Sequence, residues 1–430
     1  MFYMKSKLPT PAIPIPIPKK KKRRDNRIHN RPLEPIELEL TSFASGGRAV
    51  GHHNDGRIVF VEYGIPGEHV IAEITNSQPN FIEATAVLVT ESSPHRVEAP
   101  CTYFGQCGGC QLQHIEYDKQ LQLKNDVIAN QLIHIGNFSK AETDSWLKTM
   151  IGAVNSWNYR NHMRFTVRRD GQIGFMQRGT HRFLRINECK IASPKANELL
   201  NSLQDRTMQT QQISIRVAEN TDDYLIQPHL KWRPRTKSNR PSSGQRSYHE
   251  QIDDHDYRVS AGAFFQVNTK QAEVLVRLVT ERVLEMQPSK VIDAYSGVGT
   301  FAAQLAPEVE EIITIEFSSA ADGDASINLQ GYENITRIEG TVESTFQKLD
   351  LKADVLIIDP PRSGLDKESI QTLIDSSIER IVYISCDPGT LARDLRLLVD
   401  GNFDIIDIQP LDMFPHTQHI ECITTLDKKT

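Results

Sequence analysis

Four side chains with acid, base or nucleophile chemistry stand at the ends of short apolar runs in the last third of the chain. They are Asp293 in "VIDAYSG", Glu316 at the end of "IITIE", Asp359 after "VLII" and Cys386 after "IVYIS". Each run has the length and composition of a buried strand in a parallel sheet. Ligands of α/β proteins bind at the carboxyl ends of such strands, so we expect these four side chains to share one site.

The turn after Asp293 has the composition of a ligand-binding loop. "DAYSGVGTF" predicts a strand end, a Gly-rich turn and a helix start, and Glu316 follows about 23 residues later, where a carboxylate could accept hydrogen bonds from ribose hydroxyls. Ala302 replaces the third glycine of a dinucleotide fingerprint, and Asp293 could face a cation. The pattern favours S-adenosylmethionine, a sulfonium without phosphates, over a dinucleotide. A structural turn without a ligand is the remaining alternative.

Cys386 and Glu421 are the candidate nucleophile and base. A lone cysteine is more often a small buried hydrophobe, but a thiolate beside a methyl donor has a specific use. Its addition to C6 of uracil makes C5 nucleophilic, and a base must then remove the C5 proton. We expect Arg393, or the helix beginning near Thr390, to lower the thiol pKa. Glu421 in "HIECITTL" is the candidate base, with a salt-bridged strand glutamate as the alternative.

Two further motifs contain residues that could contact a ligand. In "DPPR", Asp359 either faces the site or caps the next helix, and Arg362 stands where methyltransferases of exocyclic amines carry an aromatic residue. This arginine counts against amine methylation. In "AFFQVN", Phe264 and Phe265 could stack on a flipped base and Gln266 could hydrogen-bond a ligand, although adjacent aromatics are more often core.

A second group of thiols indicates a metal site. "CTYFGQCGGC" places Cys101, Cys107 and Cys110 within ten residues, and Cys189 in "RINECKI" could be a fourth ligand. Thiolate ligands alone do not separate zinc from an iron–sulfur cluster. Cysteines without a secretory signal pattern point to a reducing compartment, and we therefore expect a cytoplasmic protein. Cys422 is expected in the core.

Composition divides the chain into four segments. Residues 1–33 form a Pro/Lys/Arg-rich head that we expect to be disordered, and its basic block at 18–24 is either a nucleic-acid-binding arm or a solvated tail. Residues 34–93 contain four or five short β-type runs, typical of a small OB-like barrel. Residues 94–265 form a central domain and 266–430 an α/β domain. No run of about 18 apolar residues occurs, so no membrane span is expected.

From about residue 36 onward, the motifs resemble the RNA uracil-5-methyltransferases that carry a TRAM domain and a 4Fe–4S cluster. "CTYFGQCGGCQLQH" is similar to the family's cluster motif, and "AFFQVN", "DAYSGVGTF", "DPPRSGL", "SCDPGTLARDL" and "HIECITTL" follow in the family's order. The resemblance implies a class I SAM-dependent methyltransferase domain of the α/β, Rossmann-like type. It also implies an N-terminal TRAM β-barrel that binds RNA and a central α+β iron–sulfur domain.

The same resemblance implies roles for individual residues. It makes Cys386 the nucleophile and Glu421 the base. It implies that the 4Fe–4S cluster is bound by Cys101, Cys107, Cys110 and Cys189. The residues implied around S-adenosylmethionine and the target uridine are Gln266, Tyr295, Thr300, Glu316, Thr341 and Asp359, of which Thr300 and Thr341 stand where family members use asparagine.

We therefore predict an enzyme that forms 5-methyluridine in structured RNA through a covalent adduct between Cys386 and C6 of uracil. The expected substrate is 23S rRNA rather than tRNA, and no obligate protein partner and no membrane association are expected. One alternative is the same chemistry in the T loop of tRNA. A second is a catalytically idle RNA-binding or ribosome-assembly protein, and a third is methylation of another base or a protein amine, which would not need Cys386.

Overall fold

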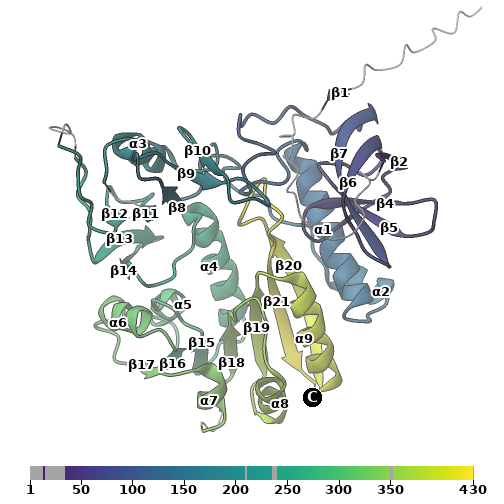
Figure 1. Cartoon of the computed structure of the whole chain (residues 1–430). Coiled ribbons are helices and arrows are strands. Elements are labelled where there is room, and N and C mark those ends of the chain that lie inside the picture. Colours follow the sequence, from purple (N-terminus) through teal and green to yellow (C-terminus); the bar gives the residue numbers. More distant parts are fainter. Residues whose placement is uncertain (1–12, 15–33, 209–210, 235–239, 349–351, 430) are drawn as a thin grey trace, which may run out of the picture. The chain divides into compact units, whose positions relative to one another are not determined.

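The computed structural model describes residues 13–14, 34–208, 211–234, 240–348 and 352–429 (Figure 1). These residues form two compact units. The first contains the described residues up to Leu123 together with Met176–Leu184 and His416–Gln418, and the second contains Lys124–Phe175, Arg185–Pro415 and the chain from His419 onward. No described helix is long and apolar enough to cross a membrane.

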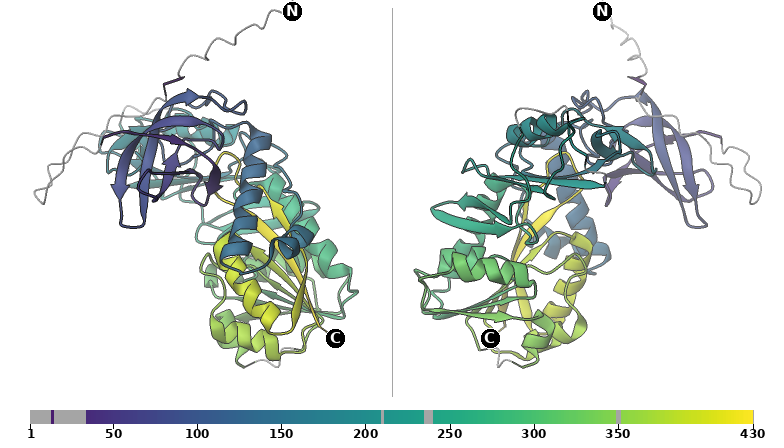
Figure 2. Two further views of the ribbon diagram at one scale, coloured as in Figure 1. Left: turned by 90° about the vertical axis from the view of Figure 1, so that its right-hand side faces the viewer. Right: turned by 60° about the vertical axis from the view of Figure 1, so that its left-hand side comes forward.

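The first unit contains a sheet of short strands in the order β2-β6-β7-β5-β4-β3, drawn in purple and blue in Figure 2. Alternate residues of β4 and β5 are buried, as expected for strands with one face on a core. The strands are β2 Ile36–Glu39, β3 Ser42–Ala44, β4 Arg48–His52, β5 Ile58–Glu62, β6 His69–Ser77 and β7 Phe81–Glu91. The segment thus has one strand more than the four or five predicted.

The predicted disordered head contains a short strand. β1, Ile13–Pro14, pairs antiparallel with β7 opposite Val89 and Leu88. These two residues therefore correct the prediction for the head. The basic block at 18–24 lies outside the described residues.

The central part of the chain contains a five-stranded sheet in the order β10-β9-β8-β11-β12 and a hairpin of β13 and β14. The strands are β8 His162–Val167, β9 Ile173–Met176, β10 Phe183–Arg185, β11 Gln212–Val217, β12 Tyr224–Gln227, β13 Ser247–Ile252 and β14 His255–Ser260. The helices are α1 Tyr117–His134, α2 Lys140–Trp146 and α3 Pro194–Leu203. Leu199, Leu200 and Leu203 of α3 are buried, so this helix covers one side of the core.

The C-terminal part is a seven-stranded sheet in the order β17-β16-β15-β18-β19-β21-β20, which confirms the predicted α/β fold. Its first five strands are parallel, whereas β21 runs antiparallel to both of its neighbours. The strands are β15 Lys290–Ala294, β16 Glu311–Glu316, β17 Ile335–Glu339, β18 Val355–Ile358, β19 Arg380–Ser385, β20 Phe403–Leu411 and β21 Glu421–Lys428. The helices are α4 Thr269–Leu284, α5 Thr300–Leu305, α6 Ser319–Asn328, α7 Val342–Phe346, α8 Lys367–Asp375 and α9 Pro388–Asp400.

The boundary between β19 and α9 follows from local chemistry. All six residues of β19 are buried, and the strand ends at Ser385. Asp387 caps α9 by accepting hydrogen bonds from the backbone N–H groups of Gly389 and Thr390, both at 3.0 Å. Pro388 occupies the first helical position, where a missing N–H costs nothing, so the helix begins two residues before the predicted Thr390. Cys386 is thereby held between a buried strand and a capped helix.

Candidate active site

The four side chains at the predicted strand ends lie at one edge of the sheet. Asp293 is the penultimate residue of β15 and Glu316 the last residue of β16, while Asp359 follows β18 and Cys386 follows β19. These strands are parallel neighbours, which places their carboxyl ends together as the sequence predicts.

Glu421 reaches the same edge because β21 is antiparallel. Glu421 is the first residue of this strand, and Cys422 pairs with Ser385, the last residue of β19. The start of β21 therefore lies beside the end of β19, and Glu421 neighbours Cys386. A parallel strand would have placed Glu421 at the opposite edge of the sheet.

Burial of Cys386 favours the protonated form of its thiol. Burial raises its pKa to about 11, and the negative charges of Glu421 and Asp359 add to this rise, while Arg362 opposes it. The predicted lowering of this pKa is therefore wrong for the ligand-free site. Arg393, one expected source of the effect, instead donates to Asp394 at 2.8 Å and to the Ser363 carbonyl at 2.9 Å.

The two nearby carboxyl groups favour their protonated forms. Glu421 is 4% exposed, and burial, reinforced by Asp359, raises its pKa well above the ordinary range, again opposed by Arg362. Burial likewise raises the pKa of Asp359 to about 7, although this residue is still partly accessible to a ligand. The pair therefore favours holding a proton near neutral pH.

Arg362 supplies a positive charge beside Cys386 and Glu421. The sequence had indicated only that this arginine replaces an aromatic residue in the "DPPR" motif. Its guanidinium nitrogen lies 3.3 Å from Nδ1 of His419, and its carbonyl accepts a hydrogen bond from the Thr390 hydroxyl at 3.1 Å. Burial, with Arg362 and other cations adding, lowers the pKa of His419 to about 4, so the imidazole is neutral at neutral pH. His419 was not predicted, and its position two residues before Glu421 was the only hint.

The Gly-rich loop is joined to Glu316 by backbone hydrogen bonds. The N–H groups of Gly297 and Ser318 donate to the two carboxylate oxygens of Glu316, at 2.8 and 2.6 Å. Gly297 and Gly299 both have positive φ, but an added Cβ at Gly299 would come within 2.9 Å of the Leu329 side chain, whereas the space beside Gly297 is open. Gly299 therefore serves packing, and Gly297 leaves room for a ligand.

The carboxyl of Asp293 is buried, and its contact with the Ala302 N–H lies outside the distance and angle limits of a hydrogen bond. It is 1% exposed, and neither carboxyl oxygen meets hydrogen-bonding geometry with any described residue. Burial raises the pKa of this carboxyl to about 8, and the nearby Asp359 and Glu316 raise it further. The N–H of Ala302 partly opposes this rise. An unpartnered acid next to an open loop fits a cationic ligand such as S-adenosylmethionine.

The other predicted cofactor residues take defined structural positions. Thr341 caps α7 through its hydroxyl, which accepts from the Ser344 N–H at 3.2 Å. The Tyr295 hydroxyl donates to Glu343 at 3.0 Å. Thr300 is the first residue of α5.

Only one of the two predicted aromatics is available for stacking. Phe264 is 68% exposed, but Phe265 is packed in the core, which corrects its expected role. The carbonyl of Gln266 accepts a hydrogen bond from the Asn161 side chain at 3.1 Å.

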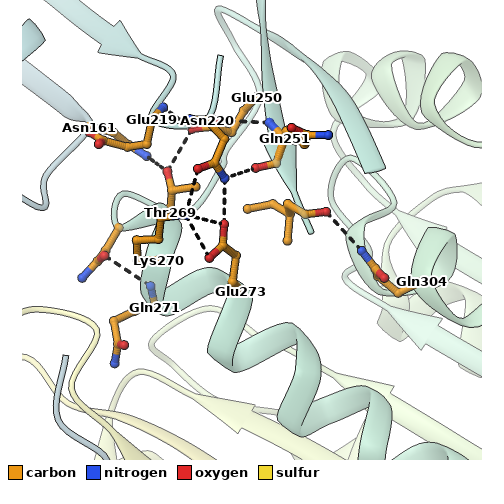
Figure 3. Close-up of polar contacts among 12 residues, drawn as sticks. Asn161, Glu219, Asn220, Glu250, Gln251, Thr269, Lys270, Gln271, Glu273 and Gln304 are labelled. Atoms are coloured by element: carbon orange, nitrogen blue, oxygen red, sulfur yellow. Dashed lines mark hydrogen bonds and ion pairs between the residues drawn. The ribbon is translucent and has the colours of Figure 1, made fainter. Parts of the chain in front are cut away.

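A buried polar network fixes the start of α4, the helix that follows Gln266 (Figure 3). Asn161 donates to the Thr269 hydroxyl at 3.0 Å, and this hydroxyl donates to the fully buried Glu250 at 2.9 Å. Glu250 also accepts from the backbone N–H groups of Glu219 and Asn220. This network rigidly supports the segment that carries Gln266.

The predicted metal site is not confirmed. Cys101, Cys107 and Cys110 belong to the first unit, and Cys189 belongs to the second. Among the described residues, no group of three or more histidine, cysteine, aspartate or glutamate side chains is arranged to hold a metal ion. Cys422 is buried, as expected.

Comparison with known families and proteins identifies what the chain resembles. Residues 247–429 match the tRNA (uracil-5-)-methyltransferase family, and residues 34–87 match the TRAM domain. Proteins named as RNA methyltransferases in Streptomyces coelicolor and Caldanaerobacter subterraneus are each 32% identical to the chain. The matches cover 92% of this chain in both cases, and 93% and 98% of the two relatives.

A solved structure from Pyrococcus abyssi is similar to this chain. It is a tRNA (uracil-54, C5)-methyltransferase in complex with S-adenosyl-L-homocysteine. The similarity has a TM-score of 0.70 and 25% sequence identity, and it covers 91% of this chain and 100% of the other.

Proposed function

Because the chain belongs to the tRNA (uracil-5-)-methyltransferase family of RNA methyltransferases, we propose that it methylates C5 of a specific uridine in 23S rRNA through a covalent adduct with Cys386. The observation that carries this proposal is the position of Glu421 beside Cys386 at the carboxyl edge of the sheet. A nucleophile and a base at one point are what the chemistry of uracil C5 requires. The match to a TRAM domain supports RNA as the partner.

The second candidate is the same reaction on tRNA. It is favoured by the Pyrococcus relative, whose name gives uracil-54 of tRNA as its target. The preference for 23S rRNA rests on the resemblance of the motifs alone. A catalytically idle RNA-binding protein is less well supported, because it would not need Cys386 and Glu421 together.

The methyl donor S-adenosylmethionine is supported by the S-adenosyl-L-homocysteine complex of the Pyrococcus relative. In this chain, Glu316 would bind the ribose hydroxyls, and Asp293 would lie near the cationic part of the donor. Phe317, which follows Glu316 and is 71% exposed, could cover the adenine. Gln266, Tyr295, Thr300, Thr341 and Asp359 are the further predicted contacts.

The side chains of this site then act in order. With the carboxylates of Asp359 and Glu421 ionised, Asp359 takes the proton of the Cys386 thiol. The sulfur bonds to C6 of uracil, and the electron pair of the C5–C6 double bond moves toward C5 and O4. When bound, S-adenosylmethionine supplies an electrophilic methyl group for C5. Glu421 next takes the C5 proton, the double bond re-forms, and the C6–S bond breaks with its electron pair returning to sulfur. The raised pKa of Glu421 makes its carboxylate, in its ionised form, a stronger base than an exposed glutamate.

The test is methyl transfer from tritiated S-adenosylmethionine to unmodified transcripts of 23S rRNA and of tRNA. We expect label at C5 of uridine, no label with Cys386→Ala, and a covalent protein–RNA adduct on denaturing gels with Glu421→Gln. Cys422→Ala, which removes the neighbouring buried thiol, is the matched control and should retain activity. Label on an exocyclic amine, or an active Cys386→Ala variant, would refute the covalent route. Label in the tRNA transcript alone would select the second candidate.

The 4Fe–4S cluster remains a hypothesis from the sequence. It is supported by the spacing of Cys101, Cys107 and Cys110 and by the family motif around them. Because the described side chains do not form a metal-binding group, no step of the reaction is assigned to a cluster.

A further inference from the structure

One face of the central sheet carries a group of basic side chains, here called the cationic face: Arg160, His162, Arg164 and Arg216. In β8, Met163, Phe165 and Val167 are buried, so His162 and Arg164 point to the other side of the strand. β11 pairs antiparallel with β8 so that Arg216 stands opposite His162 and Ser214 opposite Arg164 (β8 and β11 are teal in Figure 1).

The side chains of the cationic face are held in place by neutral groups. His162 Nε2 lies 2.9 Å from the Ser214 hydroxyl. Arg160 donates to the His162 carbonyl at 3.0 Å, and Arg216 donates to the Ser260 carbonyl at 3.3 Å. Arg164 is exposed to solvent. Arg216 is largely buried, at 6% exposed, so Arg160 and Arg164 carry the positive charges that a ligand at this face can reach.

Carboxylates compensate little of this charge. No described acidic side chain forms an ion pair with Arg160, Arg164 or Arg216. Asp324 is near enough to act on Arg216, but its own ion pair is with Arg258. Burial lowers the pKa of His162 to about 3, and Arg216, Arg164 and Arg160 lower it further by repulsion. Arginines grouped on one face without carboxylate partners repel one another, so a group of this kind calls for an explanation other than folding.

The cationic face is electrostatically linked to the active site. Arg160 acts on His162, and it also helps Arg362 to keep His419 uncharged. Asn161, which lies between Arg160 and His162 in the chain, holds the Gln266 carbonyl. Arg160 therefore acts both on the central sheet and on His419, the neighbour of Arg362.

We propose that the cationic face binds backbone phosphates of the RNA strand next to the target uridine. Guanidinium groups match phosphate oxygens through paired N–H donors, and such contacts fix the register of a strand without reading its sequence. The exposed Phe264, in the segment that Asn161 supports, adds a surface on which a flanking base can stack. This inference rests on RNA being the substrate, as in the proposed function.

The test measures binding of the full chain to a fluorescein-labelled, single-stranded oligouridylate of twelve nucleotides, at several salt concentrations. Arg164→Gln should bind about fivefold more weakly at low salt, and the slope of log affinity against log salt should fall by about 0.7 for one lost phosphate contact. Arg277→Gln on α4 is the matched control, because Arg277 is also exposed and forms only a long ion pair, at 4.0 Å, with Glu281. This control should leave both quantities unchanged.

Two further measurements separate binding from folding and from catalysis. The melting temperature of Arg164→Gln should equal or exceed that of the wild type, because the substitution removes a repulsive charge, and its affinity for S-adenosyl-L-homocysteine should be unchanged. An Arg164→Gln variant with wild-type affinity and salt slope would overturn the inference, even if the wild type methylates RNA. A wild type that transfers no methyl group to RNA, yet binds oligouridylate through Arg164, would instead refute the proposed function alone.

Discussion

At the residue scale, Asp293 indicates a ligand site because its buried carboxyl accepts no hydrogen bond from the described residues. Its carboxyl is 1% exposed and has no hydrogen-bond partner among the described residues. A buried, unsatisfied acid weakens a fold unless a ligand or a proton compensates it. The sequence placed Asp293 before a Gly-rich turn, but only the structure revealed that its oxygens are unpartnered.

Asp293→Asn should be more stable than the wild type in alkaline solution. In the unfolded chain the Asp293 carboxyl has an ordinary pKa of 3.8, whereas in the folded chain burial raises this pKa to about 8. Between these values the folded state binds more protons, so stability falls as the pH rises. The difference in free energy of unfolding, variant minus wild type, should therefore be about 2 to 4 kcal/mol larger at pH 9 than at pH 5.

Urea unfolding at pH 5 and pH 9 provides the measurement. Asp222→Asn is the control, because Asp222 is almost fully exposed and its substitution should change stability little at either pH. Calorimetry should also show weaker binding of S-adenosyl-L-homocysteine to Asp293→Asn. Equal pH dependence in the variant and the wild type would contradict the assigned state of this carboxyl.

At the scale of elements, the strand that carries Glu421 depends on a buried ion pair. Lys124 of α1 lies 2.7 Å from Asp412, which directly follows β20, and it also donates to the Phe414 carbonyl at 3.1 Å. Both charged side chains are at most 2% exposed. The segment after Asp412 leads into β21, so this contact helps to position the base.

Lys124→Met should destabilise the chain and slow methyl transfer. Removing one partner of a buried ion pair leaves a charge in the interior and costs about 3 to 5 kcal/mol. The double variant Lys124→Met/Asp412→Leu removes both charges and should recover most of the loss. Urea unfolding and turnover on unmodified RNA measure the two effects. A single variant as stable as the wild type would show that this pair does not anchor the segment.

At the scale of the whole molecule, the four cysteines predicted to bind a cluster are divided between the two compact units. Cys101, Cys107 and Cys110 lie within ten residues of one another in the sequence, whereas Cys189 is distant. Convergence of all four thiols is therefore a property of the assembled molecule, which spacing alone does not establish.

Anaerobic purification tests the cluster directly. A 4Fe–4S protein should be brown, with about four iron atoms per chain. Cys107→Ser should lose the colour and the iron, whereas Cys422→Ser should retain both because Cys422 is buried on β21. A colourless protein with stoichiometric zinc, or without metal, would refute the iron–sulfur prediction.

Local spacing in the sequence was sufficient for much of the fold and the site. Apolar runs, turn residues and the order of the motifs predicted the α/β sheet and the edge shared by Asp293, Glu316, Asp359 and Cys386, because parallel strands bring their ends together by geometry. The cap and Pro388 of α9 are also local, and the predicted start was wrong by only two residues.

Tertiary structure decided what depends on distant neighbours. The antiparallel direction of β21 brings Glu421 to Cys386. The eight residues of this strand do not by themselves specify its direction. Burial made the thiol pKa high instead of low, and packing removed Phe265 from the site. The sequence by itself thus determined which chemical groups the protein carries, whereas the folded chain decided which of them meet and in which protonation state, because strand pairing and desolvation arise only from contacts between distant segments.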